Sequence, residues 1–371
     1  MVSRPLPARL VLVLALALAL LTPPASAAPV HGSFAYDYRN TPTVAPLLDR
    51  ELVILSARGY FAPGRVDSLH AAGVKPYVIV QPNQAWRLRG VAIGAAPGDD
   101  RTFPWDTATY RLARRHDAIL RDSTGISIDM FGGVSWSSMV LDFGNREFAR
   151  EYAALLVATF PRAAGVLLDY GCPWIPVALP DWASWRAGWI GMLEEVRRRR
   201  PDLALISQCD QWTRDLPVDG ILLERVGSAL NPPARSFATA RALRAAGKRV
   251  FFRQESTDAG TRRFFAGTAL VFDGAFDQCA DPNQVPPLHR RNVEHFELAG
   301  GPAAGDAWES SPGIWQRMTK RGLVIVNASA RPHTYRDNAT TAFVIPAGDA
   351  LLIQYRDHRG RLIKARSNAG R

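Results

Sequence analysis

Two acidic residues stand at the ends of two strand-like stretches of the sequence. The apolar run GVLLD ends on Asp169, and the run GILLE ends on Glu224. A carboxylate is costly to bury without a partner, so a chain that places one where a buried strand reaches the surface directs it at a ligand or at a cation. Two carboxyl groups that flank one bond meet the requirement of glycoside hydrolysis, because one protonates the leaving oxygen while the other attacks or activates water.

The competing interpretation of each carboxylate is a structural ion pair with a nearby arginine, such as Arg225 or Arg253. Proximity of the two acids would push their pKa values apart and provide one acid and one base near neutral pH. The placement of both acids at strand ends favours the catalytic interpretation over two unrelated ion pairs.

The elements that position these acids are apolar runs that recur through most of the chain. The runs are continuous rather than alternating, which is typical of parallel strands covered on both faces. Helical segments separate several of them, at 64–73, 146–160, 182–200 and 234–247. Strands that alternate with helices form βαβ units, and eight such strands predict an α/β protein with a closed (β/α)8 TIM barrel and irregular crossovers. The eight runs are 33–38, 51–56, 75–80, 165–169, 203–207, 220–224, 249–253 and 268–273.

In such a barrel every strand delivers its C-terminal end to the same face, where active sites are built. Asp169 and Glu224 are 55 residues apart in the sequence, about two barrel units, which places them on the fourth and sixth strands. A cleft rich in carboxylates and amides suits a polyhydroxylated ligand, because both groups form hydrogen bonds with hydroxyls. The other polar residues at the strand ends are therefore expected to bind substrate, and they are Asp37, Gln81, Gln208, Asp210, Gln254, Glu255 and Asp273.

Residues 81–164 form one long excursion after the third strand, and they include Trp105 and Trp136. Long insertions after barrel strands usually shape active sites, so this one is a candidate for a substrate-binding wall in which Trp136 covers the apolar face of a sugar ring. The alternative is a packed subdomain with a small core of its own. Asn145 or Asp142 is expected to cap the helix that ends the excursion.

The first residues have the pattern of a secretory signal peptide. Arg4 and Arg9 precede the apolar run 10–21, and Ala25-Ser26-Ala27 follows as a small-residue cleavage site, so residues 1–27 are expected to be removed. An uncleaved anchor is the alternative, but the run is shorter than the roughly 20 apolar residues that a spanning helix needs. We expect an exported bacterial protein, secreted or periplasmic, without stable membrane insertion.

The composition bounds the partners and the cofactors. The formal net charge of +11 invites a nucleic-acid interpretation, but the densest basic cluster, RRRRP at 197–201, closes a helix whose dipole it complements. We therefore expect no nucleic-acid partner, and we expect a monomer. We also expect no cofactor and no metal, because no metal-ligand spacing or nucleotide-binding loop occurs in the sequence. Of three cysteines, Cys172 and Cys209 are candidates for a disulfide between neighbouring loops, and Cys279 is left over.

The pattern of the sequence changes after the barrel region, from apolar runs separated by helical segments to short strands separated by turns. The barrel is expected over 28–305, and short strands with turn signals predict a small all-β domain over 306–360. Residues 361–371 are expected to be a disordered tail.

Several short motifs carry a family resemblance through their order along the chain. The motifs FAYDY, LRDSTG, LDFGNREFAREY, GVLLDYG, DGILLE and RMTKRGLVIVNAS span about residues 31 to 355. In this order they resemble the glycoside hydrolases of the barrel group that includes the endo-alpha-1,4-polygalactosaminidase-like families. The resemblance implies that Asp169 and Glu224 are the catalytic pair, with Glu224 as the acid, and that the small β unit is the C-terminal domain common in glycosidases.

These observations together predict a secreted hydrolase that cleaves the O-glycosidic bonds of a polysaccharide, with Asp169 as nucleophile or base and Glu224 as general acid. One alternative is a non-catalytic carbohydrate-binding or cell-surface protein that keeps the barrel without turnover. Another is a barrel hydrolase of a different bond, such as a deacetylase or a phosphodiesterase, which would need a metal.

Overall fold

The computed structural model describes most of the chain between residues 30 and 365. The described ranges are 30–37, 44–48, 50–82, 84–87, 104–128, 137–171, 179, 181–208, 216–224, 226, 233–253, 259–277, 304–320, 322–336, 342–355 and 362–365. No helix within these ranges is long and apolar enough to cross a membrane. Several predictions lie outside the described residues. They concern the signal peptide at 1–27 and the predicted substrate-binding residues Trp136, Asp210, Gln254 and Glu255. The three cysteines, Cys172, Cys209 and Cys279, also lie outside them, and so does the predicted disulfide between the first two.

Eight parallel strands pair in a closed ring, in the order β1-β10-β9-β8-β7-β6-β3-β2. The central strands are apolar and buried on both faces, because the barrel interior covers one face and helices cover the other. The predicted TIM-barrel-like α/β fold is confirmed, and each predicted strand except the last coincides with a barrel strand. The strands are β1 (Val30–Asp37), β2 (Arg50–Leu55), β3 (Lys75–Val80), β6 (Gly165–Leu168), β7 (Ala204–Gln208), β8 (Gly220–Glu224), β9 (Arg249–Arg253) and β10 (Ala275–Asp277).

The prediction of an eighth strand at 268–273 is wrong. These residues belong to helix α8 (Ala259–Phe272), and the strand that closes the barrel is the short β10. The helix is apolar on opposite sides because the barrel covers one side, where Phe272 packs on Phe252, and the C-terminal sheet covers the other. A short apolar run buried from two sides cannot be distinguished from a strand by periodicity.

The crossovers between barrel strands are uneven, as the spacing predicts. A 3-10 helix, η1 (Ala45–Leu47), joins β1 to β2, whereas α2 (Ala57–Phe61) and α3 (Arg65–Ala71) join β2 to β3. Residues 216–219, the described part of the β7–β8 connection, form no helix. The β6–β7 and β8–β9 connections are α6 (Trp182–Arg199) and α7 (Pro233–Ala245).

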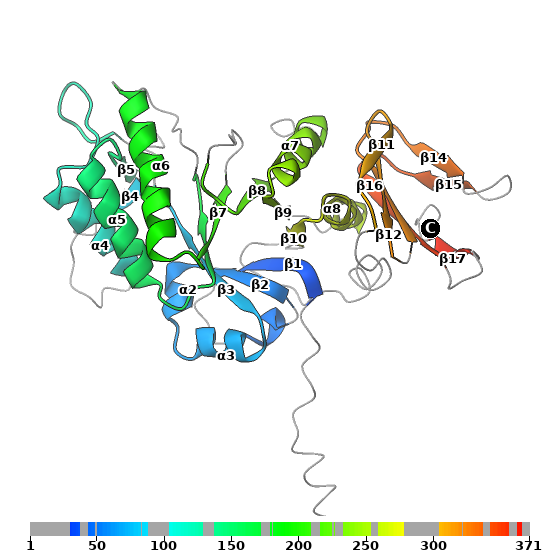
Figure 1. The fold of residues 1–371 in the computed structure, drawn as a ribbon, viewed down its shortest axis with the longest axis horizontal. Coiled ribbons are helices and arrows are strands. Elements are labelled where there is room, and N and C mark those ends of the chain that lie inside the picture. Colours follow the sequence, from blue (N-terminus) through cyan, green and yellow to red (C-terminus); the bar gives the residue numbers. More distant parts are fainter. Residues whose placement is uncertain are drawn as a thin grey trace, which may run out of the picture.

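The long excursion between β3 and β6 contains, in chain order, β4 (Gln84–Arg87), α4 (Pro104–Arg115), β5 (Ser137–Val140) and α5 (Arg146–Thr159), and β4 pairs antiparallel with β5. Asn145 caps α5 by accepting a hydrogen bond from the Phe148 amide at 3.1 Å, as predicted. Trp105 is buried against Tyr152 and joins the main core. Figure 1 shows α4, α5 and α6 side by side on one flank of the barrel, so the described part of the excursion is a packed layer.

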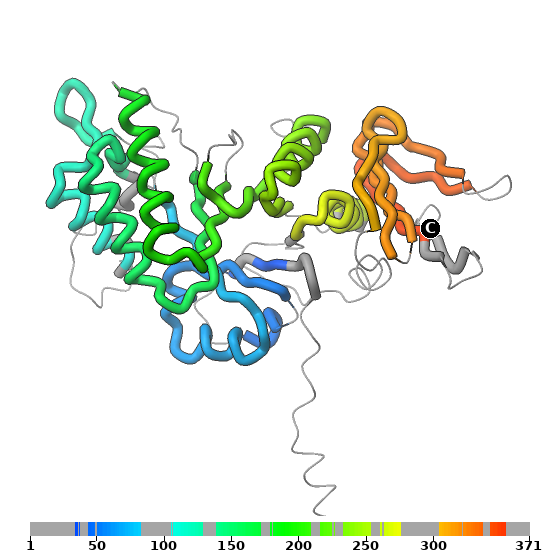
Figure 2. Tube along the Cα trace, in the orientation of Figure 1, coloured from blue at the N-terminus to red at the C-terminus, as the bar shows by residue number. Residues whose placement is uncertain are grey.

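The described residues from 308 onward form antiparallel sheets, which supports in part the predicted small all-β domain. Five strands form an antiparallel sheet in the order β11-β12-β13-β16-β17, and two more form the hairpin β14-β15. Figure 2 traces the chain from the barrel through α8 into these sheets. Their bounds are β11 (Trp308–Ser311), β12 (Ile314–Thr319), β13 (Gly322–Asn327), β14 (His333–Arg336), β15 (Ala342–Ile345), β16 (Asp349–Tyr355) and β17 (Leu362–Ala365).

Strand β17 lies inside the segment that the sequence suggested to be a disordered tail. It pairs with β16 from Ile353 to Tyr355, and the sheet therefore extends past residue 360. The polar composition of this segment hid the strand, because an edge strand needs pairing on one side only. The sheet is fastened to the barrel by Trp315, which packs on Phe237 and Phe272.

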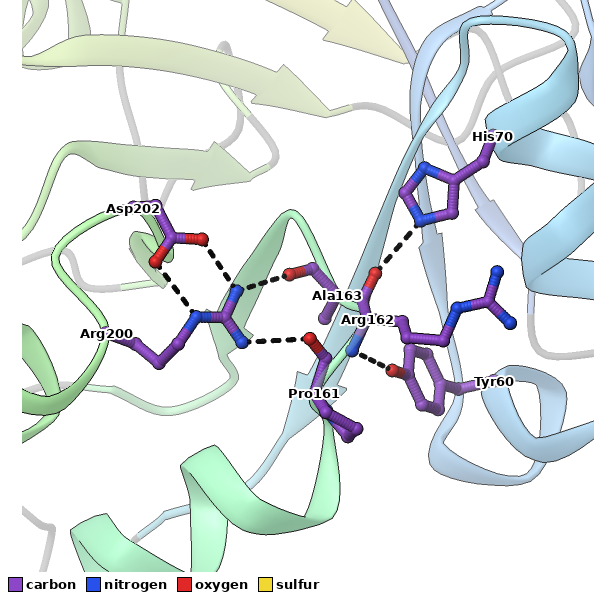
Figure 3. Close-up of polar contacts among 7 residues, drawn as sticks. All are labelled: Tyr60, His70, Pro161, Arg162, Ala163, Arg200 and Asp202. Carbon is purple, nitrogen blue, oxygen red and sulfur yellow. Dashed lines mark hydrogen bonds and ion pairs between the residues drawn. The ribbon is translucent and has the colours of Figure 1, made fainter.

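A polar network holds the turn that enters β6 at the N-terminal face of the barrel (Figure 3). Arg200 donates to the carbonyl oxygens of Pro161 at 3.1 Å and Ala163 at 3.2 Å. Tyr60 accepts a hydrogen bond from the Arg162 amide at 2.8 Å. These contacts fix the start of the strand that delivers Asp169 at its other end, so they act on the position of β6 and not on chemistry.

Candidate active site

The C-terminal ends of five neighbouring barrel strands carry a continuous arc of polar side chains. On β3, β6, β7, β8 and β9 the residues Ile79, Leu167, Ile206, Leu222 and Phe251 belong to the cluster that fills the barrel interior. Side chains alternate between the two faces of a strand, so the residue two positions later points to the same interior. Those residues are Gln81, Asp169, Gln208, Glu224 and Arg253.

The side chains of this arc form two hydrogen-bonded groups. Gln81 Nε2 donates to Asp169 Oδ2 at 2.8 Å. Gln208 Nε2 donates to Glu224 Oε2 at 2.8 Å, and Arg253 Nη1 donates to Glu224 Oε1 at 2.6 Å. The two catalytic candidates therefore differ in their surroundings, since the contacts just given are one amide for Asp169 and one amide plus one guanidinium for Glu224.

The Asp169 carboxyl group has an altered acidity. Burial raises its pKa to about 6, the hydrogen bond from Gln81 opposes that rise, and the negative charge of Glu224 adds to it. Glu224 thus lies close enough to Asp169 to act on it electrostatically. A carboxylic acid with a pKa near 6 holds its proton in a substantial fraction of molecules at mildly acidic pH, which is the property of a general acid.

The ion pair of Glu224 with Arg253 leaves part of the carboxylate accessible. The Arg253 side chain is 11% exposed and the Glu224 side chain 22% exposed. The competing interpretation of Glu224, an ion pair with Arg253, is therefore realised in the structure, but the pair lines the barrel interior and retains contact with solvent. Asp169 is held by an amide at the end of a neighbouring strand.

The structure places Asp37 away from this arc. On β1, Phe34 points into the barrel and Ala35 packs in the outer core, so Asp37 has outward parity. It is fully buried and forms an ion pair with Arg65 of α3. A side chain without exposed surface that is occupied by a buried guanidinium has no access to a ligand, and the predicted substrate contact receives no support.

Asp273 is the clearest correction among the predicted site residues. It follows α8 and precedes β10, so it lies toward the N-terminal ends of the parallel strands, opposite the arc. Its side chain is 55% exposed and pairs with Arg244 at 3.0 Å. The error follows from reading residues 268–273 as a strand.

The sequence patterns indicate Arg253 only as an ion-pair partner and assign no role to Tyr170. Arg253 could have been found by extending the interior parity of Phe251 by two residues. Tyr170 carries no pattern of its own, because its special feature is a backbone conformation, with φ at 51°. Within the described residues, no three His, Cys, Asp or Glu side chains gather in a group that could hold a metal ion.

Comparison with known proteins supports the fold. No protein-family model matches the chain, and no curated protein matches it. Among solved structures, an α-amylase from Lactobacillus plantarum is 12% identical over 88% of this chain and 99% of its own, with a TM-score of 0.54. Isomaltulose synthase from Klebsiella sp. LX3 is 10% identical over 86% and 98% of the two chains, with a TM-score of 0.52.

A third similar structure is the glycoside hydrolase domain of PelA from Pseudomonas aeruginosa. It is 19% identical over 68% of this chain and 96% of its own, with a TM-score of 0.46. The two likenesses with TM-scores above 0.5 show an α/β barrel fold and nothing finer.

Proposed function

We propose that this protein is an exported glycoside hydrolase that cleaves a polysaccharide, with Asp169 and Glu224 as its catalytic pair. The proposal rests above all on one observation, that the carboxyl groups of Asp169 and Glu224 lie at the interior ends of β6 and β8 with different hydrogen-bond partners. Two carboxyl groups with different protonation behaviour are the requirement for acid-assisted cleavage of a glycosidic bond. The fold it shares with an α-amylase is consistent with that chemistry.

The surroundings favour the reverse of the roles that the family resemblance implies. Asp169 has a pKa raised to about 6 by burial and is suited to donate a proton to the leaving oxygen. Glu224 accepts from Arg253 at 2.6 Å, and a guanidinium on a carboxylate oxygen stabilises the negative charge. We therefore assign Asp169 as the general acid and Glu224 as the nucleophile or base.

The side-chain amides of Gln81 and Gln208 also fit a substrate-binding site. Gln81 and Gln208 each donate a side-chain N–H to a carboxylate, and an amide side chain is a group that can also form hydrogen bonds with substrate hydroxyls. Both lie at the strand ends beside the catalytic pair and keep their predicted role in substrate binding. Asp210, Gln254, Glu255 and Trp136 remain predictions of the same kind.

The role assignment is tested with Asp169→Asn and Glu224→Gln. Either change should lower the release of reducing ends from an amino-sugar polymer by about 100-fold or more. Loss of the general acid is largely repaired by a substrate that needs no protonation, so D169N should regain activity on a dinitrophenyl glycoside. Azide should replace a missing nucleophile or base where the side chain is shortened, so E224A, which leaves room for the anion, should regain activity in its presence.

Asp273→Asn is the matched control, because it changes an acidic residue in the same way at the opposite end of the barrel. It should keep wild-type activity. Rescue of E224Q by the dinitrophenyl leaving group and of D169A by azide would restore the roles that the resemblance implies. Full activity of both variants, or binding of sugar by a wild-type protein that shows no hydrolysis, would contradict the proposal.

A further inference from the structure

We propose that Tyr170 contacts the substrate, with its ring forming a platform for the sugar ring bound beside Asp169. The inference rests on the proposed function and adds a binding residue to that site. It is carried by the backbone conformation of Tyr170, by the contacts that hold this conformation, and by the exposure of the side chain.

Tyr170 adopts a left-handed backbone conformation that side chains other than glycine rarely take. Its φ is 51°, and such a conformation in a bulky residue persists only when its surroundings enforce it. Only two other non-glycine residues among those described share a positive φ, Asp117 and Asp273, and aspartate tolerates that region better than tyrosine. Strained residues of this kind cluster at functional sites.

The turn that holds Tyr170 is closely fitted. The Gly171 amide donates to the Leu168 carbonyl oxygen at 3.1 Å, and Ser207 Oγ donates to the Gly171 carbonyl oxygen at 2.6 Å. A Cβ atom on Gly171 would lie 2.5 Å from the Leu168 carbonyl oxygen, so a glycine is required there. The turn is thus fixed from β7, the strand between the two catalytic candidates.

This turn has two consequences for the site. The Tyr170 backbone amide acts on the Asp169 carboxyl group and lowers its pKa, which opposes the rise that burial causes. At this turn the chain also reaches the surface, since Leu167 and Leu168 are fully buried whereas Tyr170 is 42% exposed.

Tyr170 differs in position from the other exposed aromatic side chains of the described chain. Phe61 packs on Phe160 near the N-terminal face, and Trp308 lies on the edge strand β11 of the C-terminal sheet. Tyr170 alone among these three lies two residues after a barrel strand, next to a catalytic candidate. An aromatic face beside a carboxyl group matches a pyranose, whose C–H face is apolar and whose rim carries hydroxyls.

The test separates the ring from the turn with three variants of Tyr170. Tyr170→Phe keeps the ring, Tyr170→Ala removes it and keeps the backbone strain, and Tyr170→Gly removes both. Trp308→Ala is the control, because it removes an exposed aromatic side chain far from the strand ends. KM and kcat are measured with galactosamine oligomers and maltoheptaose, and affinity is measured for the same oligomers in the D169N background.

If Tyr170 is a sugar platform, Y170A and Y170G should both raise KM and weaken oligomer binding by about tenfold or more, while Y170F and W308A stay near wild type. Y170G should unfold at a higher temperature than Y170A, because glycine relieves the left-handed strain. Equal losses in Y170A and Y170G assign the effect to the ring. Recovery of binding in Y170G, or wild-type KM in Y170A, would overturn the inference while leaving the proposed function standing. A wild-type protein that neither binds nor cleaves any oligomer would overturn both.

Discussion

Arg253 and Glu224 form a 2.6 Å ion pair at the C-terminal end of the barrel, from the facing register positions of β9 and β8. Asp169 instead accepts a 2.8 Å hydrogen bond from the Gln81 amide, and desolvation raises its pKa to about 6. One carboxyl group is thus paired with a guanidinium, and the other is inclined to keep its proton. This difference in surroundings underlies the first three predictions, on pH dependence, stability and Arg253.

The first prediction concerns the pH dependence of the rate. Since Asp169 acts as an acid with a pKa of about 6, kcat/KM should fall as the pH rises through about 6. The Gln81 hydrogen bond lowers the pKa of Asp169, so Gln81→Leu should move this alkaline limb to higher pH. The measurement is a pH–rate profile of both proteins, with D273N as a control that should match wild type. A Q81L limb at the wild-type position, or at lower pH, would contradict the assignment of Asp169.

The second prediction concerns stability. The pKa of Asp169 is raised to about 6 in the folded protein, above its ordinary value of 3.8, so the folded state binds the extra proton. Stability from this group is fully present below about pH 4 and is lost as the pH rises through about 6, by roughly 3 kcal/mol in total. Asp169→Asn is neutral at every pH and lacks that loss.

The check is urea unfolding of wild type and D169N at several pH values. The free energy of unfolding of D169N, relative to wild type, should increase from about pH 4 to about pH 7. Glu224→Gln serves as the comparison, because it changes the other carboxyl group and removes the negative charge that pairs with the buried Arg253 guanidinium. Parallel pH curves for D169N and wild type would show that Asp169 is not perturbed.

The third prediction concerns Arg253. Arg253→Met removes the charge that compensates Glu224, and we expect kcat to fall about 100-fold, because the carboxylate loses its orientation and its charge partner. Arg253 also lowers the pKa of Asp169, so the alkaline limb should move to higher pH in R253M. Arg253→Lys keeps the charge and should retain the wild-type limb. A limb that is unmoved in R253M, together with a wild-type kcat, would mean that the pair is only structural.

The fourth prediction tests how closely α6 packs on the turn before α5. A Cβ on Gly188 would lie 1.7 Å from the Phe143 carbonyl oxygen, whereas nothing lies within 4 Å of one on Gly191 in the same helix. Gly188→Ala should therefore destabilise the protein by about 3 kcal/mol or more, and Gly191→Ala should stabilise it by up to about 1 kcal/mol through helix propensity. Denaturant unfolding of the pair gives the comparison, and similar effects of both changes would contradict this packing.

Much of the barrel could be predicted from the sequence because its strands are apolar on both faces and few other structures bury such runs. The predicted cap at Asn145 also held, since a cap is a local contact between a side chain and an amide three residues ahead. The run at 268–273 could not be assigned in this way. Its apolar residues are explained by a helix covered from two sides, and the second cover, the C-terminal sheet, lies far along the chain.

The candidate site could likewise be predicted only in part from the sequence. The sequence by itself determined that Asp169 and Glu224 end two apolar strands. Because these strands run parallel in the barrel, their ends lie at the same, C-terminal face. The sequence could not separate Asp169 from Asp37, which differ in whether the side chain points into the barrel or toward α3.

Only the tertiary structure decided which carboxyl group is compensated. Arg253 comes from a strand 29 residues after Glu224, and Gln81 from one 88 residues before Asp169, so no local pattern pairs them. Protonation depends on burial and on charges that approach from other strands, and these are properties of the assembled barrel.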